Sequence, residues 1–431
     1  MGNPDIHYAE TLYQIMGRFS FRDTRKRKCV HSLQEVLTCL LIGIAAGRST
    51  QKHALQYCKN HYEELRGCMP LKHGIASPST ACRLLRMVDE DDLSDIFAEW
   101  ALSIVNTEDT VISVDGKGER ASANKVACGR TPYVLNAVET LKNLIVSVLP
   151  VGDKENEKTV FHETLEKISV QGSLLVADAM ATDQNIIRDC LNHGADVTLQ
   201  VKRNNPNLYE QLKSTIGTLR VFASEAQGTL LSDDESKVRE SFISASICEK
   251  NAGRIEHRTA WTTNDVSIIS HTETTMPGLK TIGLIEQVRI LQVRNKEGAD
   301  VTPSKEDFLQ HGSPRQPKPK SGDSIEDDIQ IVGIISTRSL NAAEALCQKR
   351  GYWAIENSVH YVLDEVFRED RYHYSINNFR MMVLRRFAYN VIRVINLREY
   401  CLSTMKDTAY YFCDSIRLIR KYIFEGIQSF Y

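Results

Sequence analysis

The feature that most constrains the fold of this chain is a change at Thr110 from helical to strand-forming sequence patterns. Beyond it, β-rich or continuously apolar runs predict strands at residues 111–114, 133–139, 144–151, 173–177 and 197–201. Helical periodicity lies between the later strands, at residues 159–168 and 183–192. The pattern therefore predicts an α/β core in which three strands are followed by helix, strand, helix and strand.

This βββαβαβ order is the topology of an RNase-H-like core, in which the first and fourth strands lie side by side. Asp115 closes the first predicted strand, where Gly116 would let the backbone turn sharply, and Asp178 closes the fourth. We expect both carboxylates at one edge of the sheet, where they would repel each other unless a cation lies between them. Taken singly, an Asp at a strand end is most often a turn residue.

A third carboxylate, Glu356, lies in a helical segment predicted over residues 340–367. That helix can pack Trp353, Ile355 and other apolar side chains against the protein, and a helix laid across the sheet would bring Glu356 over both aspartates. Three carboxylates that leave positions for water and phosphate suit Mg²⁺ or Mn²⁺, and two ions ~4 Å apart are typical of phosphoryl transfer. A Glu on a helix is more often a solvated charge. The prediction of a metal site therefore depends on the predicted topology, which brings all three carboxylates together.

The segment before residue 106 is predicted to be an all-α domain, with helices at residues 33–46, capped by Ser32, and at 51–66 and 80–88. The whole chain has a formal net charge of −2, but residues 18–86 contain 13 Lys and Arg against 4 Asp and Glu, an excess of nine positive charges. Arg83 and Arg86 share one face of the last helix, as in a DNA-recognition helix. The alternative is a solvated basic face without a partner.

Between residues 203 and 337 the sequence predicts a β-rich insertion, with strand character near residues 239–248, 254–262, 280–291 and 330–336. Within it, residues 295–328 are rich in Lys, Asp, Ser and Pro and predict a disordered loop. C-terminal helices are predicted over residues 338–431, including 377–397 and 407–427. In this last part 14 Lys and Arg outnumber 10 Asp and Glu, which makes it a weaker candidate for a second DNA-facing surface.

The composition indicates a globular protein and argues against a disulfide-rich, zinc-binding or membrane-spanning one. The chain has 431 residues, 42% of them hydrophobic and 25% charged, as expected of a globular protein with a sizeable core. Its 11 cysteines include no C-x-x-C pair, so neither a disulfide framework nor a zinc site is indicated. The first residues lack the apolar core of a secretory signal, and the apolar run from Val36 to Gly47 is too short to cross a bilayer of ~30 Å. We expect a cytoplasmic protein.

Several motifs, in order, resemble one known family. They are Gly74 to Thr80 (GIASPST), Asp115-Gly116-Lys117, Lys154 to Glu157 (KENE), Asp178-Ala179-Met180, Val201 to Pro206 (VKRNNP) and Trp353 to Asp364 (WAIENSVHYVLD). In these the chain resembles insertion-sequence transposases of the H-repeat-associated (ISAs-type) group within the DDE superfamily. It departs from the usual family pattern at Tyr352, where a His is usual, at residues 118–121, and at Asn205.

The resemblance implies hydrolysis and 3′-hydroxyl chemistry at transposon ends, with Asp115, Asp178 and Glu356 as catalytic metal ligands and two Mg²⁺ or Mn²⁺ ions as cofactors. It implies double-stranded DNA as partner, namely terminal inverted repeats and target DNA, with a homodimer holding two ends together in a bacterial cytoplasm or nucleoid. Further DNA-binding candidates, besides Arg83 and Arg86, are Lys117, Lys202, Arg350 and Trp353.

Secondary roles remain open at two positions. Trp353 can stack on an unpaired base at a strand end, although a core position is the commoner role for such a residue. His360, one turn beyond Glu356, can orient a ligand or make a helix-packing hydrogen bond. Lys117 and Arg350 can neutralise phosphate charge near the metals.

Two other functions fit the same residues. A catalytically silent protein would bind DNA as a regulator or remnant, and the intact carboxylates argue against it. A metal-dependent nuclease would cut without joining, and the three carboxylates fit it equally well. Cleavage and joining assays on the element's own DNA ends separate the three hypotheses.

Overall fold

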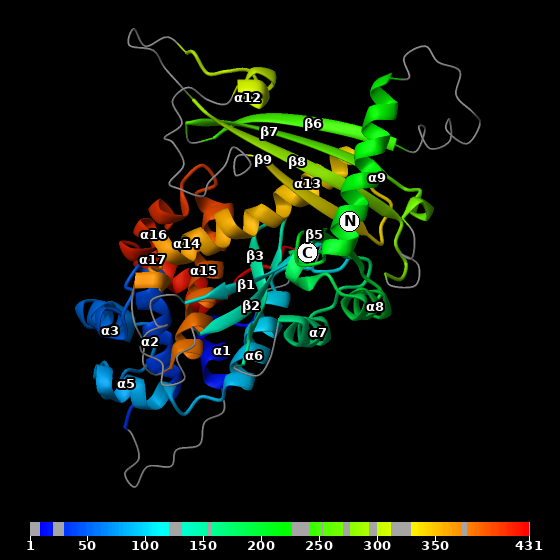
Figure 1. The fold of residues 1–431 in the computed structure, drawn as a ribbon. Helices are drawn as coiled ribbons and strands as arrows, with labels where there is room; N and C mark the ends of the chain where they lie inside the picture. Colours follow the sequence, from blue (N-terminus) through cyan, green and yellow to red (C-terminus); the bar gives the residue numbers. More distant parts are fainter. Residues whose placement is uncertain are drawn as a thin grey trace, which may run out of the picture. The chain divides into compact units, whose positions relative to one another are not determined.

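The computed structural model describes residues 9–19, 30–119, 132–152, 157–225, 242–251, 253–269, 276–292, 300–311, 329–371 and 377–430. Contacts between residues divide the chain into two compact units. The first unit contains residues 1–173 and 352–431, and the second contains residues 174–351. Both combine strands and helices, so the protein is a mixed α/β protein with a large sheet, as predicted at this level (Figure 1).

The N-terminal part of the first unit is helical throughout its described residues. Its helices are α1 (Leu12–Arg18), α2 (Leu33–Ala45), α3 (Gln51–Asn60), α4 (Tyr62–Arg66), α5 (Pro78–Leu85) and α6 (Glu90–Leu102). Almost every residue of α2 is buried, which confirms the predicted core helix. Ser32 precedes α2 but its side chain makes no capping hydrogen bond, so that predicted cap is wrong. Ser77 does cap α5, by accepting from the backbone N–H of Thr80.

Three antiparallel strands and one helix follow in the first unit. Strands β1 (Val111–Gly118), β2 (Tyr133–Glu139) and β3 (Leu144–Pro150) pair in the order β3-β2-β1, and α7 (Glu157–Lys167) comes next. The predicted end of the first strand at Val114 is wrong, because β1 continues to Gly118 and Asp115 pairs with Asn136 inside the ladder. Gly116 makes no turn there. A Cβ atom at Gly116 would lie 1.9 Å from Tyr133 Oη, so close packing requires the glycine.

The centre of the first unit is α15 (Asn378–Glu399), which packs against α2, α6 and β3. Phe387 of α15 stacks edge-on against Phe97 at 4.8 Å between ring centroids, and Trp100 lies 5.0 Å from it. The remaining helices of this unit are α14 (Tyr361–Glu365), α16 (Met405–Cys413) and α17 (Ile416–Ile419), with π-helical segments at Ile355–His360 and Arg420–Glu425. The helices predicted at residues 1–105 therefore share one compact unit with β1–β3 and α15.

The second unit is built on a sheet with the strand order β4-β5-β9-β8-β7-β6. The strands are β4 (Leu174–Ala177), β5 (Asp196–Val201), β6 (Phe242–Asn251), β7 (Arg254–Thr263), β8 (Thr281–Leu291) and β9 (Ile329–Ser336). β4 and β5 are parallel, and the other pairs are antiparallel. The helices are α8 (Gln184–Asn192), α9 (Pro206–Glu225), α12 (Lys305–His311) and α13 (Ala342–Ala354), the last of which crosses the unit boundary.

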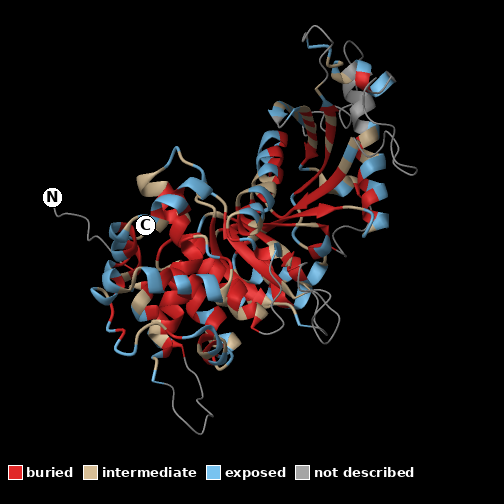
Figure 2. Cartoon of the chain, turned by 90° about the vertical axis from the view of Figure 1, so that its left-hand side faces the viewer, coloured by how far each residue is buried: buried red, intermediate tan, exposed pale blue. Residues whose placement is uncertain are grey.

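The predicted insertion contains its four strands, but two helices within it were not predicted. The 20-residue helix α9 begins at Pro206, and α12 lies inside the segment predicted to be a disordered loop. Phe308 of α12 is fully buried against Val288 and Ile290 of β8, and this apolar contact explains the order of the helix. Residues 295–299 and 312–328 of that loop lie outside the described residues. Figure 2 shows that β1–β5 are largely buried, whereas the described residues of β6 are intermediate or exposed.

Candidate active site

Asp115 lies in the middle of β1, where its carboxylate is 19% exposed. The hydroxyl of Tyr352 donates a hydrogen bond to Asp115 Oδ1 at 2.8 Å, and His360 Nδ1 lies 3.5 Å from Asp115 Oδ2. Tyr352 and His360 belong to the same helical segment of the first unit. The carboxylate is thus fixed in orientation by two uncharged groups.

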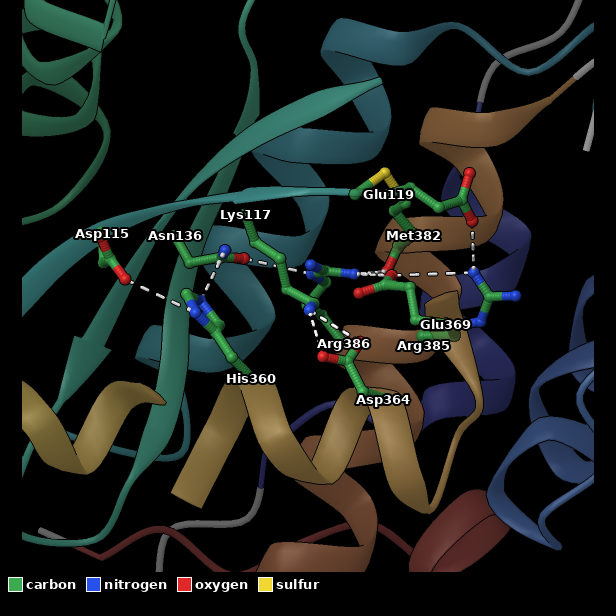
Figure 3. Close-up of polar contacts among 10 residues, drawn as sticks. All are labelled: Asp115, Lys117, Glu119, Asn136, His360, Asp364, Glu369, Met382, Arg385 and Arg386. Carbon is green, nitrogen blue, oxygen red and sulfur yellow. Dashed lines mark hydrogen bonds and ion pairs between the residues drawn. The ribbon is translucent and has the colours of Figure 1, made fainter. Parts of the chain in front are cut away.

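The proton position on His360 follows from its second neighbour, Asn136. Arg386 Nε donates to Asn136 Oδ1 at 3.1 Å, so the amide turns its Nδ2 toward His360 Nε2, 3.5 Å away (Figure 3). Nε2 must then accept, which leaves the proton on Nδ1, facing Asp115. Burial, with the charges of Lys117 and Arg386, lowers the pKa of His360 to about 3, so the imidazole is neutral at physiological pH.

Lys117, two residues beyond Asp115 on the same face of β1, is almost buried and is engaged by Asp364 of α14. Its Nζ lies 2.7 and 2.9 Å from the two carboxylate oxygens. Burial raises the pKa of Asp364, although the Lys117 ammonium acts in the opposite sense. Lys117 was predicted to neutralise phosphate charge, and its pairing with Asp364 gives it a second, internal role.

Beneath these groups lies a fully buried set of two carboxylates and two guanidinium groups, which we call the buried ion cluster: Glu119, Glu369, Arg385 and Arg386. Arg386 donates to Glu369, and Arg385 Nη1 lies 3.2 Å from Glu119 and 3.7 Å from Glu369. Burial alone would raise the pKa of Glu369, but the charges of Arg386 and Arg385 lower it below its usual value. The opposite charges balance, as burial of ions requires.

Asp178, in the second unit, directly follows β4, as predicted. Its carboxylate accepts from the backbone N–H of Ala179 and from Lys202 Nζ, the latter at 2.8 Å. Asp178 is 35% exposed and Lys202 43%, so both remain accessible to a ligand. Asn204 Nδ2 donates to the carbonyl of Ala179 at 2.6 Å and ties the two loops together.

Glu356 is exposed in the π-helical segment Ile355–His360, which replaces part of the uninterrupted α-helix predicted here. Ile355 and Val359 in this segment are buried, while Trp353 is half-buried. A π-helical turn widens the helix locally and is frequent at functional sites. It changes the direction of the side chains that follow, including His360.

The remaining predicted DNA-binding residues lie on the surface. Arg83 and Arg86 are exposed on α5, while Leu84, Leu85 and Val88 are buried, as the helical pattern predicted. Arg350, in the second unit, pairs with Glu249 at 2.8 Å. The predicted role of Arg350 beside the metals would require that pair to open.

Sequence reasoning proposed the three carboxylates as metal ligands and named His360 as a residue that could orient one of them. It missed Tyr352 as a partner of Asp115, and it missed the polar groups behind His360. Asn136 is a polar residue in the middle of an apolar strand, and Arg385 and Arg386 interrupt an apolar helix; both are unusual enough to have served as signals. Tyr352 was noted only as a departure from a family pattern. Within the described residues, no group of three His, Cys, Asp or Glu side chains is placed to hold a metal ion.

Comparison with known proteins identifies the class. A family model described as "Transposase DDE domain" matches residues 105–391, and a model described as "DDE_Tnp_1-associated" matches residues 20–101. The chain therefore belongs to the DDE transposase family. It is 20% identical over 344 residues to the H repeat-associated putative transposase YhhI of Escherichia coli K12, covering 80% of this chain and 79% of that protein.

The chain is also similar to other known proteins. The chain is 24% identical to the putative transposase YncI of Escherichia coli O157:H7, covering 85% of this chain and 83% of that one. An uncharacterized protein from the dhlA 3′ region of Xanthobacter autotrophicus is 25% identical over 61% of this chain and 83% of its own length. A solved piggyBac transposase synaptic complex with hairpin DNA aligns with a TM-score of 0.44 and 8% identity, over 96% of this chain and 80% of that one.

Proposed function

We propose that this transposase cleaves DNA strands at the ends of an insertion sequence and joins the released 3′ ends to target DNA, in a reaction that depends on Mg²⁺ or Mn²⁺. The observation that carries the proposal is the support around Asp115. Tyr352 and His360 both reach its carboxylate, and the helical segment between them carries Glu356. The segment from Tyr352 to His360 thus contacts one predicted metal ligand, Asp115, and contains another, Glu356.

The donor set fits a hard divalent cation. Asp115, Asp178 and Glu356 offer only carboxylate oxygens, which Mg²⁺ and Mn²⁺ prefer to nitrogen or sulfur. When bound, two such ions would activate the attacking oxygen and stabilise the leaving oxygen of the phosphodiester. We assign all three carboxylates to this role, on an RNase-H-like core whose element order along the chain is β1, β2, β3, α7, β4, α8 and β5.

Neighbouring side chains hold the Asp115 carboxylate in one orientation. Tyr352 fixes one oxygen of Asp115, and the neutral His360 fixes the other side of the carboxylate without competing for its charge. Hydrogen-bonded partners of this kind hold metal ligands in the geometry that binding requires. Arg386 acts one step further back, because it sets the orientation of Asn136 and so the tautomer of His360.

The proposed partners are the terminal inverted repeats of the element and a target duplex, held by a homodimer in the bacterial cytoplasm. Arg83 and Arg86 on α5 are exposed and available for phosphate or base contacts. None of the helices in the described residues is long and apolar enough to span a membrane.

The test is cleavage of end-labelled DNA that carries the element's own flanking ends, in Mg²⁺ or Mn²⁺. Asp115→Asn, Asp178→Asn and Glu356→Gln are each expected to abolish nicking at the element boundary. Glu365→Gln is the matched control, because Glu365 is an exposed carboxylate at the end of α14 whose ion-pair partner among the described residues is Arg371 at the surface.

The outcomes separate the alternatives. Metal-dependent nicking and strand joining, lost in all three variants and kept in Glu365→Gln, support the proposal. Nicking that persists in the Asp178→Asn variant removes Asp178 from the site. Nicking without joining identifies a nuclease, and binding without nicking identifies a silent DNA-binding protein.

A further inference from the structure

A basic groove lies in the second unit, between α9 and the first half of β9. β5 pairs with β9 only from Gly333 onward, so residues 329–332 of β9 extend beyond it and are paired on one side alone, with β8. The resulting cavity has a volume of about 590 Å³. It is lined by residues 329–332, Tyr209 and three cations, Lys202, Arg203 and Lys213.

The walls of the groove are held rigidly. Tyr209 Oη donates to the carbonyl of Ile331 at 3.1 Å, which joins α9 to β9. Leu212 and Ile216 of α9 are fully buried, and a Cβ atom at Gly333 would lie only 2.8 Å from Leu212 Cδ1. Close packing of the helix on the strand therefore fixes the position of α9 beside β9, and with it the position of Lys213, one turn beyond Tyr209, at the edge of the groove.

The three cations give the groove its chemistry. Arg203 and Lys213 are exposed and form no ion pair within the described residues, and no Asp or Glu is among the described residues that line the cavity. Lys202 also contacts Asp178 Oδ1 at 2.8 Å, so the groove begins at a predicted catalytic carboxylate. Unpaired cations in a concave surface raise the local concentration of anions.

A second basic cavity, near the C-terminus, lacks this property. It is lined by Arg417, Arg420 and Lys421, but Glu399 pairs with Arg417 at 2.7 Å and with Lys421 at 2.8 Å. Two of its three cations are thus already neutralised by an internal carboxylate. The groove beside α9 retains two cations without such a partner.

We propose that the groove binds the phosphodiester backbone of a DNA strand and leads it to Asp178, with Arg203 and Lys213 as phosphate contacts. This inference rests on the proposed function, because it assigns a subsite of the same DNA-processing centre. A cavity of this size accommodates a ligand of nucleotide dimensions. Lys202 bridges the groove and Asp178, and so lies where a phosphate next to the reacting one would pass.

The experiment measures the affinity of the full chain for duplex DNA carrying the element's ends, without divalent metal, as a function of salt. Arg203→Gln combined with Lys213→Gln is expected to weaken binding at least about 10-fold at 0.1 M salt. The slope of log affinity against log salt should fall by roughly 0.9 for each lost phosphate contact. Lys250→Gln is the control, because Lys250 is an exposed lysine on β6 in the same unit, lies outside the groove and forms no ion pair among the described residues.

Each outcome decides the inference. A smaller slope and weaker binding in the double variant alone support it. An equal loss in Lys250→Gln, or no loss in the double variant while wild-type protein still binds and nicks DNA, overturns the groove and leaves the proposed function standing. Binding of inorganic phosphate is measured on the same proteins. If the double variant loses phosphate binding but keeps its affinity for DNA, the groove is a small-anion site, and the proposal that it holds a DNA strand is overturned. Absence of DNA binding and nicking by the wild type overturns both proposals.

Discussion

Tyr352 and His360 approach Asp115 from positions eight residues apart, on a helical segment that contains a π-helical stretch. In a regular α-helix, residues eight apart lie two turns apart and about 12 Å along the axis. The structure brings both to one carboxylate, Tyr352 to Oδ1 and His360 to Oδ2. Tyr352 also stands where the family usually has a histidine, so a hydroxyl donor serves Asp115 at this position.

This geometry predicts a measurable role for the Tyr352 hydroxyl. Tyr352→Phe keeps the ring but removes the hydrogen bond to Asp115, so we expect DNA cleavage to need more Mg²⁺ and to slow by about 10- to 100-fold. Single-turnover cleavage across a Mg²⁺ titration measures both effects. Tyr361→Phe, an exposed tyrosine in the same segment, is the control. Equal Mg²⁺ dependence in Tyr352→Phe and wild type would show that Tyr352 does not position Asp115.

At the scale of elements, periodicity predicted most of the strands and helices of the first 200 residues. It failed at α9, although Leu208, Leu212 and Ile216 are buried at the spacing of a helix face. Ser214, Thr215 and Gly217 in this helix weaken its helix propensity, and packing of the apolar face against β8 and β9 compensates. The end of β1 was also misplaced, because Gly116 suggested a turn and only the contact with Tyr133 shows why a glycine is needed.

The buried ion cluster joins three elements that the sequence separates: the end of β1, the segment after α14, and α15. Arg386→Met leaves the fully buried carboxylate of Glu369 without its nearest cation. Breaking a buried pair in this way is expected to lower the free energy of unfolding by about 3–5 kcal/mol. Urea unfolding of the full chain measures the loss.

A surface pair provides the comparison for that prediction. Arg371 and Glu365 are both exposed and lie 3.1 Å apart, so Arg371→Met should cost about 0–1 kcal/mol. If Arg386→Met were no more destabilising than Arg371→Met, the buried ion cluster would contribute nothing to the stability of the first unit.

For the whole molecule, the order of the predicted strands placed Asp115 and Asp178 on β1 and after β4, but it did not predict which residues surround them. Asp115 and Asp178 could be proposed as ligands because each is tied to a strand in a recognisable series. Asn136 and Arg386 could not be assigned to the same site, because residues 250 apart meet only through the packing of α15 on the first unit. Partners of this kind depend on tertiary contacts, and a single sequence contains no local pattern that specifies them.

Glu399 at the end of α15 pairs with Arg417 and Lys421 of the C-terminal helices, and we expect this carboxylate to make the stability of the chain sensitive to acid. Burial opposes ionisation, but hydrogen bonds from Lys421, Arg417 and Tyr422 lower the pKa of Glu399 to about 2. A carboxylate whose pKa falls on folding stabilises the protein above its unfolded pKa of about 4.3, and this stabilisation is lost as pH falls toward 2. Glu399→Gln should therefore destabilise the chain at pH 7, and the difference from wild type should shrink at lower pH.

Urea unfolding between pH 7 and the lowest pH at which both proteins remain folded measures this convergence. Glu425→Gln is the control, because Glu425 is exposed close to the same helices and forms no ion pair in the described residues. Its difference from wild type should stay small and constant across the range. A Glu399→Gln difference that stays constant with pH would mean that the hydrogen bonds of Glu399 do not favour its charged form, and would overturn this prediction.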